Sequence, residues 1–127
     1  MDKKWLIDDF RTALQQFTEA LQTPATSNLI KAGCIQYFEF CFELAWKSIK
    51  VANDELGLPE CTSPKSCLKS AFAQGWIESE EPWLEMLLAR NRMAHTYDAA
   101  TALAVYDKLK GFQQPLEALC MHFERMV

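Results

Sequence analysis

Near its start, the chain spaces its hydrophobic residues with the period of an α-helix. Between about residues 4 and 21, apolar side chains recur three and four positions apart, so they form one stripe along a helix. The members of this stripe are Leu6, Phe10, Ala13, Leu14, Phe17 and Leu21. A break over residues 23–27 follows, in which Thr26 or Ser27 can cap the next helix. We therefore expect an amphipathic helix that buries this stripe.

The second predicted helix, at about residues 28–56, is long and mostly apolar, and it ends at Gly57 and Pro59. At 1.5 Å per residue it would measure about 43 Å. Its polar residues form a narrow stripe made of Gln36, Glu39, Glu43, Lys47, Lys50 and Asp54. The apolar arc covers well over half of the circumference, whereas a surface helix needs only about 100°. The pattern predicts a helix that is central to a bundle or that buries a second face against another chain, which indicates an oligomer.

The remainder of the chain predicts shorter helices with recognisable ends. Ser63 is a suitable N-cap, Pro64 occupies the first helical position, and Gly75 follows the last turn. The further helices are predicted from about Ser79 to Arg90, from Ala99 to Lys110 after an Asp98 cap and before a break at Gly111, and from about Gln113 to Met126. No region resembles a strand pair. We therefore predict an all-α, up-and-down bundle of four to five main helices in a single domain, residues 1–127.

Composition narrows the classes of function. The net charge of −4 means that any contact with nucleic acid must depend on a local basic patch. No apolar run is long enough for a transmembrane helix, and Asp8 and Asp9 interrupt any signal-peptide core. The five cysteines are odd in number and contain no C-x-x-C, so neither a disulfide framework nor a zinc site is indicated. We expect a cytoplasmic protein whose thiols act as small hydrophobic groups, with no metal and no cofactor.

Residues 90–97 form the densest group of reactive side chains. The segment reads Arg90-Asn91-Arg92-Met93-Ala94-His95-Thr96-Tyr97. A histidine can remove the proton from an RNA 2′-hydroxyl, and an arginine can hold the phosphate and stabilise the charge that develops on it. Arg90 and His95 are five residues apart, about 140° around an ideal helix, so they converge only if the helix loosens or a second chain completes the site. The plainer alternative is that both arginines are surface cations near a helix C-terminus.

Two other candidates have simpler explanations. Glu39 and Glu43 lie on one helix face, where paired carboxylates can bind a cation or transfer protons. Because Lys47 follows Glu43 at i+4, we interpret the pair as part of a solvated or interchain stripe. His122 is a lone histidine in the last helix, and we interpret it as half-buried and not as a ligand.

The sequence also resembles a known family along its length, from about residue 5 to 125. The similar segments are Tyr37-Phe38-Glu39-Phe40-Cys41-Phe42-Glu43-Leu44-Ala45-Trp46-Lys47, Ser63-Pro64, Ala71-Phe72-Ala73-Gln74-Gly75-Trp76-Ile77, Trp83-Leu84-Glu85-Met86-Leu87, and Arg90-Asn91 with His95-Thr96-Tyr97. They resemble the nucleotidyltransferase substrate-binding protein family, which belongs to the HEPN superfamily of all-α domains. The resemblance implies a homodimer that brings two Arg/His motifs together.

The resemblance also implies two functions. The first is a metal-independent ribonuclease toxin, in which Arg90 and His95 are catalytic, Asn91 orients the site and Arg92 assists with phosphate; tRNA is among the candidate substrates. In similar toxin–antitoxin pairs, a minimal nucleotidyltransferase silences the toxin by adenylating the tyrosine that corresponds to Tyr97. The second is a non-catalytic subunit that presents substrate to its nucleotidyltransferase partner. Both descriptions apply to one protein if Tyr97 is itself the substrate of the transferase.

Overall fold

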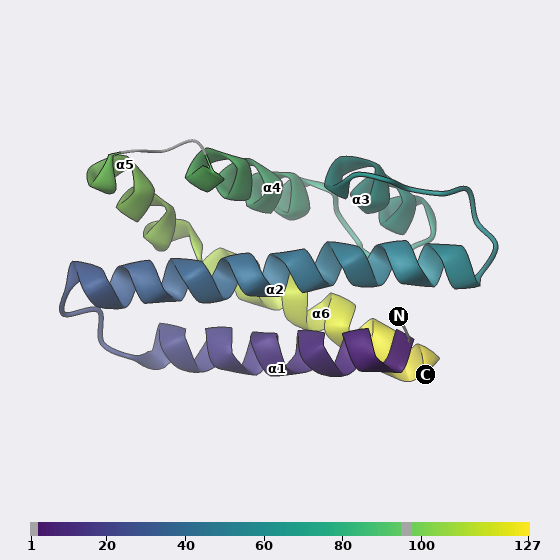
Figure 1. Cartoon of the computed structure of the whole chain (residues 1–127), viewed down its shortest axis with the longest axis horizontal. Helices are drawn as coiled ribbons and strands as arrows, with labels where there is room; N and C mark the ends of the chain where they lie inside the picture. Colours follow the sequence, from purple (N-terminus) through teal and green to yellow (C-terminus); the bar gives the residue numbers. More distant parts are fainter. Residues whose placement is uncertain (1–2, 95–97) are drawn as a thin grey trace.

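The computed structural model describes residues 3–94 and 98–127, and within these ranges it is helical without strands. The elements are α1 (Lys3–Gln22), α2 (Asn28–Glu55), α3 (Pro64–Ala73), α4 (Glu81–Ala94), α5 (Ala99–Leu103), the 3₁₀ helix η1 (Ala104–Lys108) and α6 (Lys110–Met126). α1 and α2 run antiparallel, α6 lies behind them, and α3 and α4 lie along the opposite side of α2 (Figure 1). The predicted all-α bundle is confirmed.

The amphipathic stripe of α1 is buried as predicted. Leu6, Phe10, Ala13, Leu14, Phe17 and Leu21 are all in the core. This stripe packs mainly against α2, with α6 on its other side. Burial of six apolar side chains on one face explains why a helix with a strongly polar opposite face is stable here.

The long helix α2 is the centre of the bundle. The Ser27 hydroxyl caps it by accepting a hydrogen bond from the Ile30 backbone N–H at 3.3 Å. Phe38 is fully buried, and its ring centroid lies 5.2 Å from that of Phe112 and 6.1 Å from those of Phe17 and Phe42. Three helices therefore meet at one aromatic cluster, and the prediction that this helix is central is confirmed.

Part of the apolar arc of α2 is nevertheless left uncovered. Tyr37 is 38% exposed and Phe40 is 49% exposed, and their rings meet edge to face at 6.3 Å. Leu44 and Val51 continue the same side of the helix and are half-buried. We call Tyr37, Phe40, Leu44 and Val51 the uncovered apolar stripe.

Helix α3 has the predicted ends. Ser63 and Ser66 form a capping box, in which the Ser63 hydroxyl accepts from the Ser66 backbone N–H at 3.2 Å and the Ser66 hydroxyl accepts from the Ser63 N–H at 3.1 Å. Gly75 adopts φ +76° just after the helix, a left-handed conformation that glycine tolerates best. Helix α4 begins at Glu81, slightly later than the predicted Ser79, and continues to Ala94.

The predicted fifth helix and its break at Gly111 are wrong. Asp98 does cap a helix, but that helix ends at Leu103, and a 3₁₀ turn follows up to Lys108. Gly111 lies inside α6, which starts at Lys110. A glycine costs a helix about 1 kcal/mol relative to alanine. Burial of Phe112 and Leu116 in the first turns of α6 offsets that cost.

The expectation that every cysteine is a free thiol is also wrong. Cys61 and Cys67 are joined by a disulfide, with 5.0 Å between their Cα atoms, and this bond ties the loop before α3 to the helix itself. Spacing did not reveal the pair, because only the fold of the loop brings Cys61 back to Cys67. Cys34, Cys41 and Cys120 are free and buried, as expected of small hydrophobic groups. Within the described residues, no helix is long and apolar enough to cross a membrane.

Candidate functional site

The candidate site forms where the last turns of α4 lie against the polar stripe of α2. Arg90 comes from α4, and its Nε donates a hydrogen bond to Oε1 of Glu43 on α2 at 2.8 Å. The two side chains are 33% and 31% exposed, respectively. Trp83, one helical heptad before Arg90, is buried on the same face of α4, so packing of Trp83 orients Arg90 toward α2.

Glu43 is held by a second donor. Its Oε2 accepts a hydrogen bond from the indole Nε1 of Trp46, three residues along α2, at 2.9 Å. Both carboxylate oxygens therefore have a partner, which fixes the plane of the carboxylate beneath Arg90. Glu43 is therefore not simply solvated, because Arg90 and Trp46 engage it, and the interchain alternative stays a prediction.

Asn91 completes the arrangement. Arg90 Nη1 donates to Asn91 Oδ1 at 3.1 Å. A guanidinium has five N–H donors, and among the described residues no acceptor engages Nη2. Within the described part of the chain, Arg90 thus has one side fixed by Glu43 and Asn91 and another side without a partner. Arg90 and Asn91, which the sequence predicts in one site, are in contact in the structure.

A further carboxylate lies close to this pair. Burial raises the pKa of the Glu39 carboxyl above its ordinary value, repulsion from Glu43 raises it further, and Arg90 lowers it. Glu39 therefore feels the charges of both partners of the ion pair. Among the described residues, no group of three or more His, Cys, Asp or Glu side chains is arranged to hold a metal ion.

The other predicted site residues divide into two groups. Arg92 is exposed and lies beside a small cavity of about 70 Å³ between α4 and η1 that Leu88, Val105 and Lys108 also line. His95 and Tyr97 lie outside the described residues, so the geometry of the Arg90–His95 pair stays a prediction. The described chain resumes at Asp98, whose carboxylate accepts from the Thr101 hydroxyl at 2.8 Å and the Thr101 N–H at 3.2 Å, and these hydrogen bonds lower its pKa.

Comparison with known proteins places the chain in a family. Residues 6–125 match the family described as "Nucleotidyltransferase substrate binding protein like". The chain belongs to this family. The residues of the match include α2 and α4, so the Glu43–Arg90 pair lies within the region that defines membership.

Individual proteins are similar to the chain in sequence and in fold. A "Probable ribonuclease HepT" of Haemophilus influenzae is 31% identical over 99 residues, which are 72% of this chain and 66% of that protein. A crystal structure of a Thermus thermophilus protein has a TM-score of 0.81 at 27% identity and covers 91% of this chain and 99% of its own. A Haemophilus influenzae structure described as revealing "the fold of a substrate binding domain of a nucleotidyltransferase" has a TM-score of 0.69 at 26% identity, over 97% of this chain and 99% of its own.

Glu43 and Trp46 are members of the site that the sequence did not predict. One signal in the sequence could have indicated Glu43. It lies on the narrow polar stripe of a helix that is otherwise largely apolar, and a carboxylate in such surroundings is favoured beside a cation. What the sequence alone did not show is which cation, because Arg90 lies 47 residues away.

Proposed function

We propose that this protein is a metal-independent endoribonuclease, and that Arg90 binds and polarises the scissile phosphate. The observation behind the proposal is the guanidinium of Arg90, which Glu43 and Asn91 orient while Nη2 has no acceptor among the described residues. A pre-oriented donor stabilises the charge that develops on a phosphate without further reorganisation. The similarity to a probable ribonuclease supports this assignment over a purely structural role.

The chemistry of the proposal needs one base and one acid. His95 takes the proton from the ribose 2′-hydroxyl, and the 2′-oxygen then attacks phosphorus. The bond to the 5′-oxygen breaks, that oxygen receives a proton from imidazolium, and the products carry a 2′,3′-cyclic phosphate and a 5′-hydroxyl. Asn91 holds Arg90 in place, and Arg92 adds positive charge for the neighbouring phosphates.

A homodimer completes the proposal. The uncovered apolar stripe on α2 offers an aromatic surface that water would otherwise hydrate. Pairing of two copies would supply a second Arg90–His95 set, as the resemblance implies. Phe40→Glu is expected to convert the dimer to a monomer, measured by analytical ultracentrifugation, whereas Lys65→Glu on the exposed surface of α3 leaves the dimer intact.

The proposal extends to control by a partner. A minimal nucleotidyltransferase would transfer AMP from ATP to the Tyr97 hydroxyl and release pyrophosphate, and the added phosphate charge would compete with RNA for the arginines. The toxin role follows if the unmodified form degrades cellular RNA.

A second function is supported by the family description and by the second structural neighbour, both of which refer to substrate binding for a nucleotidyltransferase. In that case the chain is a non-catalytic subunit that forms a stable complex with the transferase. The two functions differ in one observable, because only the first predicts RNA cleavage by the isolated chain.

Cleavage of total RNA and tRNA in EDTA tests the proposal. Intact mass first establishes that Tyr97 carries no adenylate. Wild-type protein is expected to cleave, His95→Ala to be inactive, and Lys65→Ala to match wild type. Absence of cleavage by the unmodified wild type, or equal cleavage by His95→Ala, contradicts the ribonuclease assignment and favours the substrate-binding subunit.

A further inference from the structure

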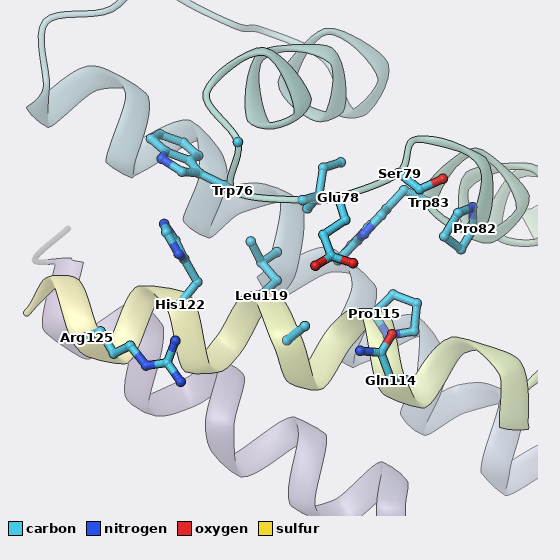
Figure 2. Close-up of a pocket in the computed structure, with 13 residues that line it drawn as sticks. Trp76, Glu78, Ser79, Pro82, Trp83, Gln114, Pro115, Leu119, His122 and Arg125 are labelled. Carbon is cyan, nitrogen blue, oxygen red and sulfur yellow. The ribbon is translucent and has the colours of Figure 1, made fainter.

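A separate cavity lies between the α3–α4 connection and α6, apart from the Glu43–Arg90 pair (Figure 2). It has a volume of about 270 Å³. Its lining includes Trp76, Glu78, Trp83, His122 and Arg125. Ligand pockets for drug-sized molecules start at about 300 Å³, so this cavity suits a ligand of about the size of one nucleoside.

One wall of the cavity is aromatic and held in place. The Trp76 ring is half-buried, lies 6.4 Å from the His122 ring at a tilt of 37°, and meets the Phe123 ring edge to face at 5.7 Å. Phe123 is fully buried, so this contact anchors the indole. In Figure 2, His122 points up from α6 toward Trp76 at one end of the cavity. A fixed indole with an accessible face is a stacking surface for a planar heterocycle.

Trp83 supplies a hydrogen-bond donor. The side chain is only 1% exposed, and no acceptor among the described residues takes a hydrogen bond from its Nε1–H. No described side-chain nitrogen or oxygen is both sealed from solvent and without a partner. The N–H therefore keeps a small contact with solvent, and Trp83 is one of the residues that line this cavity. A nearly buried donor of this kind is satisfied by water or by a ligand.

Glu78 supplies hydrogen-bond acceptors in the same cavity. Its carboxylate points from the α3–α4 connection toward α6 (Figure 2), lines the same cavity as Trp83, and has no hydrogen-bond or ion-pair partner among the described residues. A carboxylate offers two acceptor oxygens side by side. Guanine presents a matching edge, with the N1–H and the 2-amino group adjacent and the O6 acceptor next to them. Adenine presents one donor beside an acceptor, so it matches a carboxylate less well.

We propose that this cavity binds the guanine base of a guanine nucleotide. The base stacks on Trp76, its N1–H and 2-amino group donate to Glu78, and its O6 accepts from the Trp83 Nε1–H. Arg125 is also among the residues that line the cavity, and it offers the positive charge that would pair with the phosphate. A free nucleotide and a guanine within single-stranded RNA share this chemistry. The proposal is independent of the ribonuclease assignment, because it requires binding and no cleavage.

The four tryptophan indole N–H signals in a ¹H–¹⁵N correlation spectrum report on this cavity directly. Addition of guanosine 5′-monophosphate is expected to shift the signals of Trp76 and Trp83 and to leave that of the exposed Trp5 in place. Adenosine 5′-monophosphate is expected to bind at least about tenfold more weakly, because adenine lacks the two adjacent donors that pair with the carboxylate. Equal affinity for the two nucleotides, or no shift of Trp76 and Trp83 at millimolar guanosine monophosphate, would overturn the proposal.

Two variants separate recognition from stacking. Glu78→Gln is expected to weaken the guanine nucleotide at least about tenfold and the adenine nucleotide little, whereas Trp76→Ala weakens both. Glu60→Gln, an exposed acid in the loop before α3, is the matched control and is expected to bind as wild type. An unchanged guanine preference in Glu78→Gln contradicts the assignment. The unchanged remainder of each spectrum verifies folding.

The source of the base is resolved with short 2′-O-methyl RNA, which resists 2′-hydroxyl attack. If an oligonucleotide with one guanine shifts Trp76 and Trp83 at a lower concentration than the free nucleotide, the ligand is RNA. If the free nucleotide is the tighter binder, the ligand is the nucleotide. His95→Ala is expected to retain either response, so failure of the ribonuclease proposal and failure of this proposal are distinguishable.

Discussion

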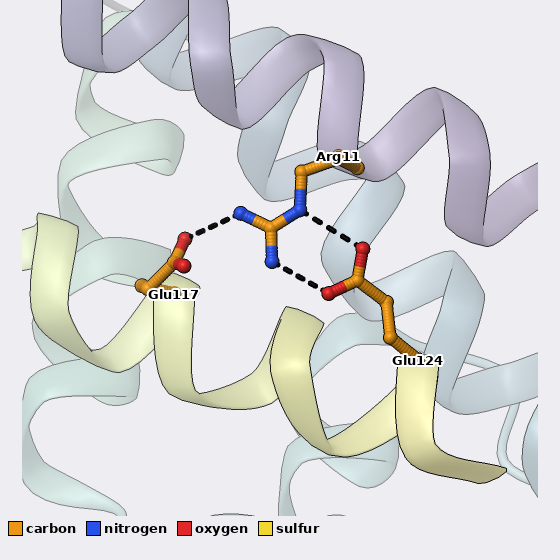
Figure 3. Close-up of polar contacts among 3 residues, drawn as sticks. All are labelled: Arg11, Glu117 and Glu124. Atoms are coloured by element: carbon orange, nitrogen blue, oxygen red, sulfur yellow. Dashed lines mark hydrogen bonds and ion pairs between the residues drawn. The ribbon is translucent and has the colours of Figure 1, made fainter.

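Two arginines in this protein bridge helices through glutamates, and they do so in contrasting ways. Arg11 on α1 reaches two glutamates of α6: Nε and Nη2 donate to the two oxygens of Glu124 at 3.0 and 2.7 Å, and Nη1 donates to Glu117 at 2.7 Å (Figure 3). Arg90 on α4 meets Glu43 through Nε and Asn91 through Nη1. All three nitrogens of Arg11 are used, whereas Nη2 of Arg90 has no acceptor within the described part of the chain.

The difference is the one expected between a structural tie and the phosphate-binding group that we propose. Hydrogen bonding to Glu124 raises the pKa of the Arg11 guanidinium further above its ordinary value and lowers the pKa of the Glu124 carboxyl. Because all three nitrogens of Arg11 already donate to glutamates, few N–H donors remain for a ligand. Arg90 is also oriented by two partners, but its Nη2 has no acceptor among the described residues, which is the arrangement that the proposed phosphate recognition requires. Ion pairing alone therefore does not distinguish the two arginines, whereas the number of guanidinium donors that have described partners does.

The largest expected effect concerns activity. Arg90→Ala is expected to lower RNA cleavage by about 10²- to 10³-fold, the usual loss when one pre-oriented donor to a developing anion is removed. Thermal stability should change little, because the Arg90 side chain is 33% exposed and solvent screens its ion pair with Glu43. Arg11→Ala serves as the contrasting variant, with cleavage close to wild type at a temperature where both are folded. An equal loss of RNA cleavage in Arg90→Ala and Arg11→Ala would contradict the proposed difference between the two arginines.

The second effect concerns the positioning of Arg90. Glu43→Gln keeps the shape of the side chain but removes its charge, so Arg90 is held less firmly. We expect kcat for cleavage to fall about tenfold with a smaller change in KM, in line with losses on removing a group that orients an active residue. Trp46→Phe, which removes one donor to Glu43, is expected to show a smaller decrease. A change in KM alone would indicate that Glu43 affects binding but does not position Arg90 for the reaction.

The third effect concerns stability. Arg11→Ala removes the link between α1 and α6 and is expected to cost about 1 kcal/mol, because the network is partly exposed and solvent screens it. The corresponding decrease in Tm is about 4 °C, measured by thermal unfolding followed by circular dichroism. Arg90→Ala is the comparison, and a larger decrease there than in Arg11→Ala would reverse the assigned roles.

The smallest effect is a difference in how two carboxyls, those of Glu124 and Glu39, make the folding stability depend on pH. The pKa of Glu124 is lowered in the folded state, so its contribution to stability is present above the ordinary value of 4.5 and is lost as pH falls through the lowered value. The pKa of Glu39 is raised, so its ionisation disfavours the folded state at neutral pH, and this penalty disappears below 4.5. Glu124→Gln should therefore destabilise, and Glu39→Gln slightly stabilise, at about pH 7. Both differences should shrink at about pH 3 in chemical unfolding, and a difference that stays constant over this range would contradict the stated causes.

Local patterns predicted the parts of the fold that depend on local sequence. The stripe from Leu6 to Leu21, the Ser27 and Ser63 caps and the Gly75 stop are all confirmed. The boundary at Gly111 was wrong, because burial of Phe112 compensates for a residue that disfavours helix. The Cys61–Cys67 disulfide was missed, because it depends on the path of a loop that no periodicity describes.

The site was predictable only within one short stretch of the sequence. Arg90, Asn91, His95 and Tyr97 are neighbours along the chain, so their spacing drew attention to them. Glu43 and Trp46 belong to another helix, and only the packing of α4 on α2 brings them to Arg90. His95 and Tyr97 stay predictions of the sequence, since they lie outside the described residues.

The central claim is that Arg90 is held with donors free for a phosphate and that Arg11 is not. The most direct measurement follows the arginine Nε–H and Nη–H signals by ¹⁵N NMR during titration with a short 2′-deoxy-substituted RNA that resists cleavage. The account predicts that the Arg90 signals shift in a saturable way and that the Arg11 signals stay in place. Movement of neither arginine, or of both to the same extent, would contradict it.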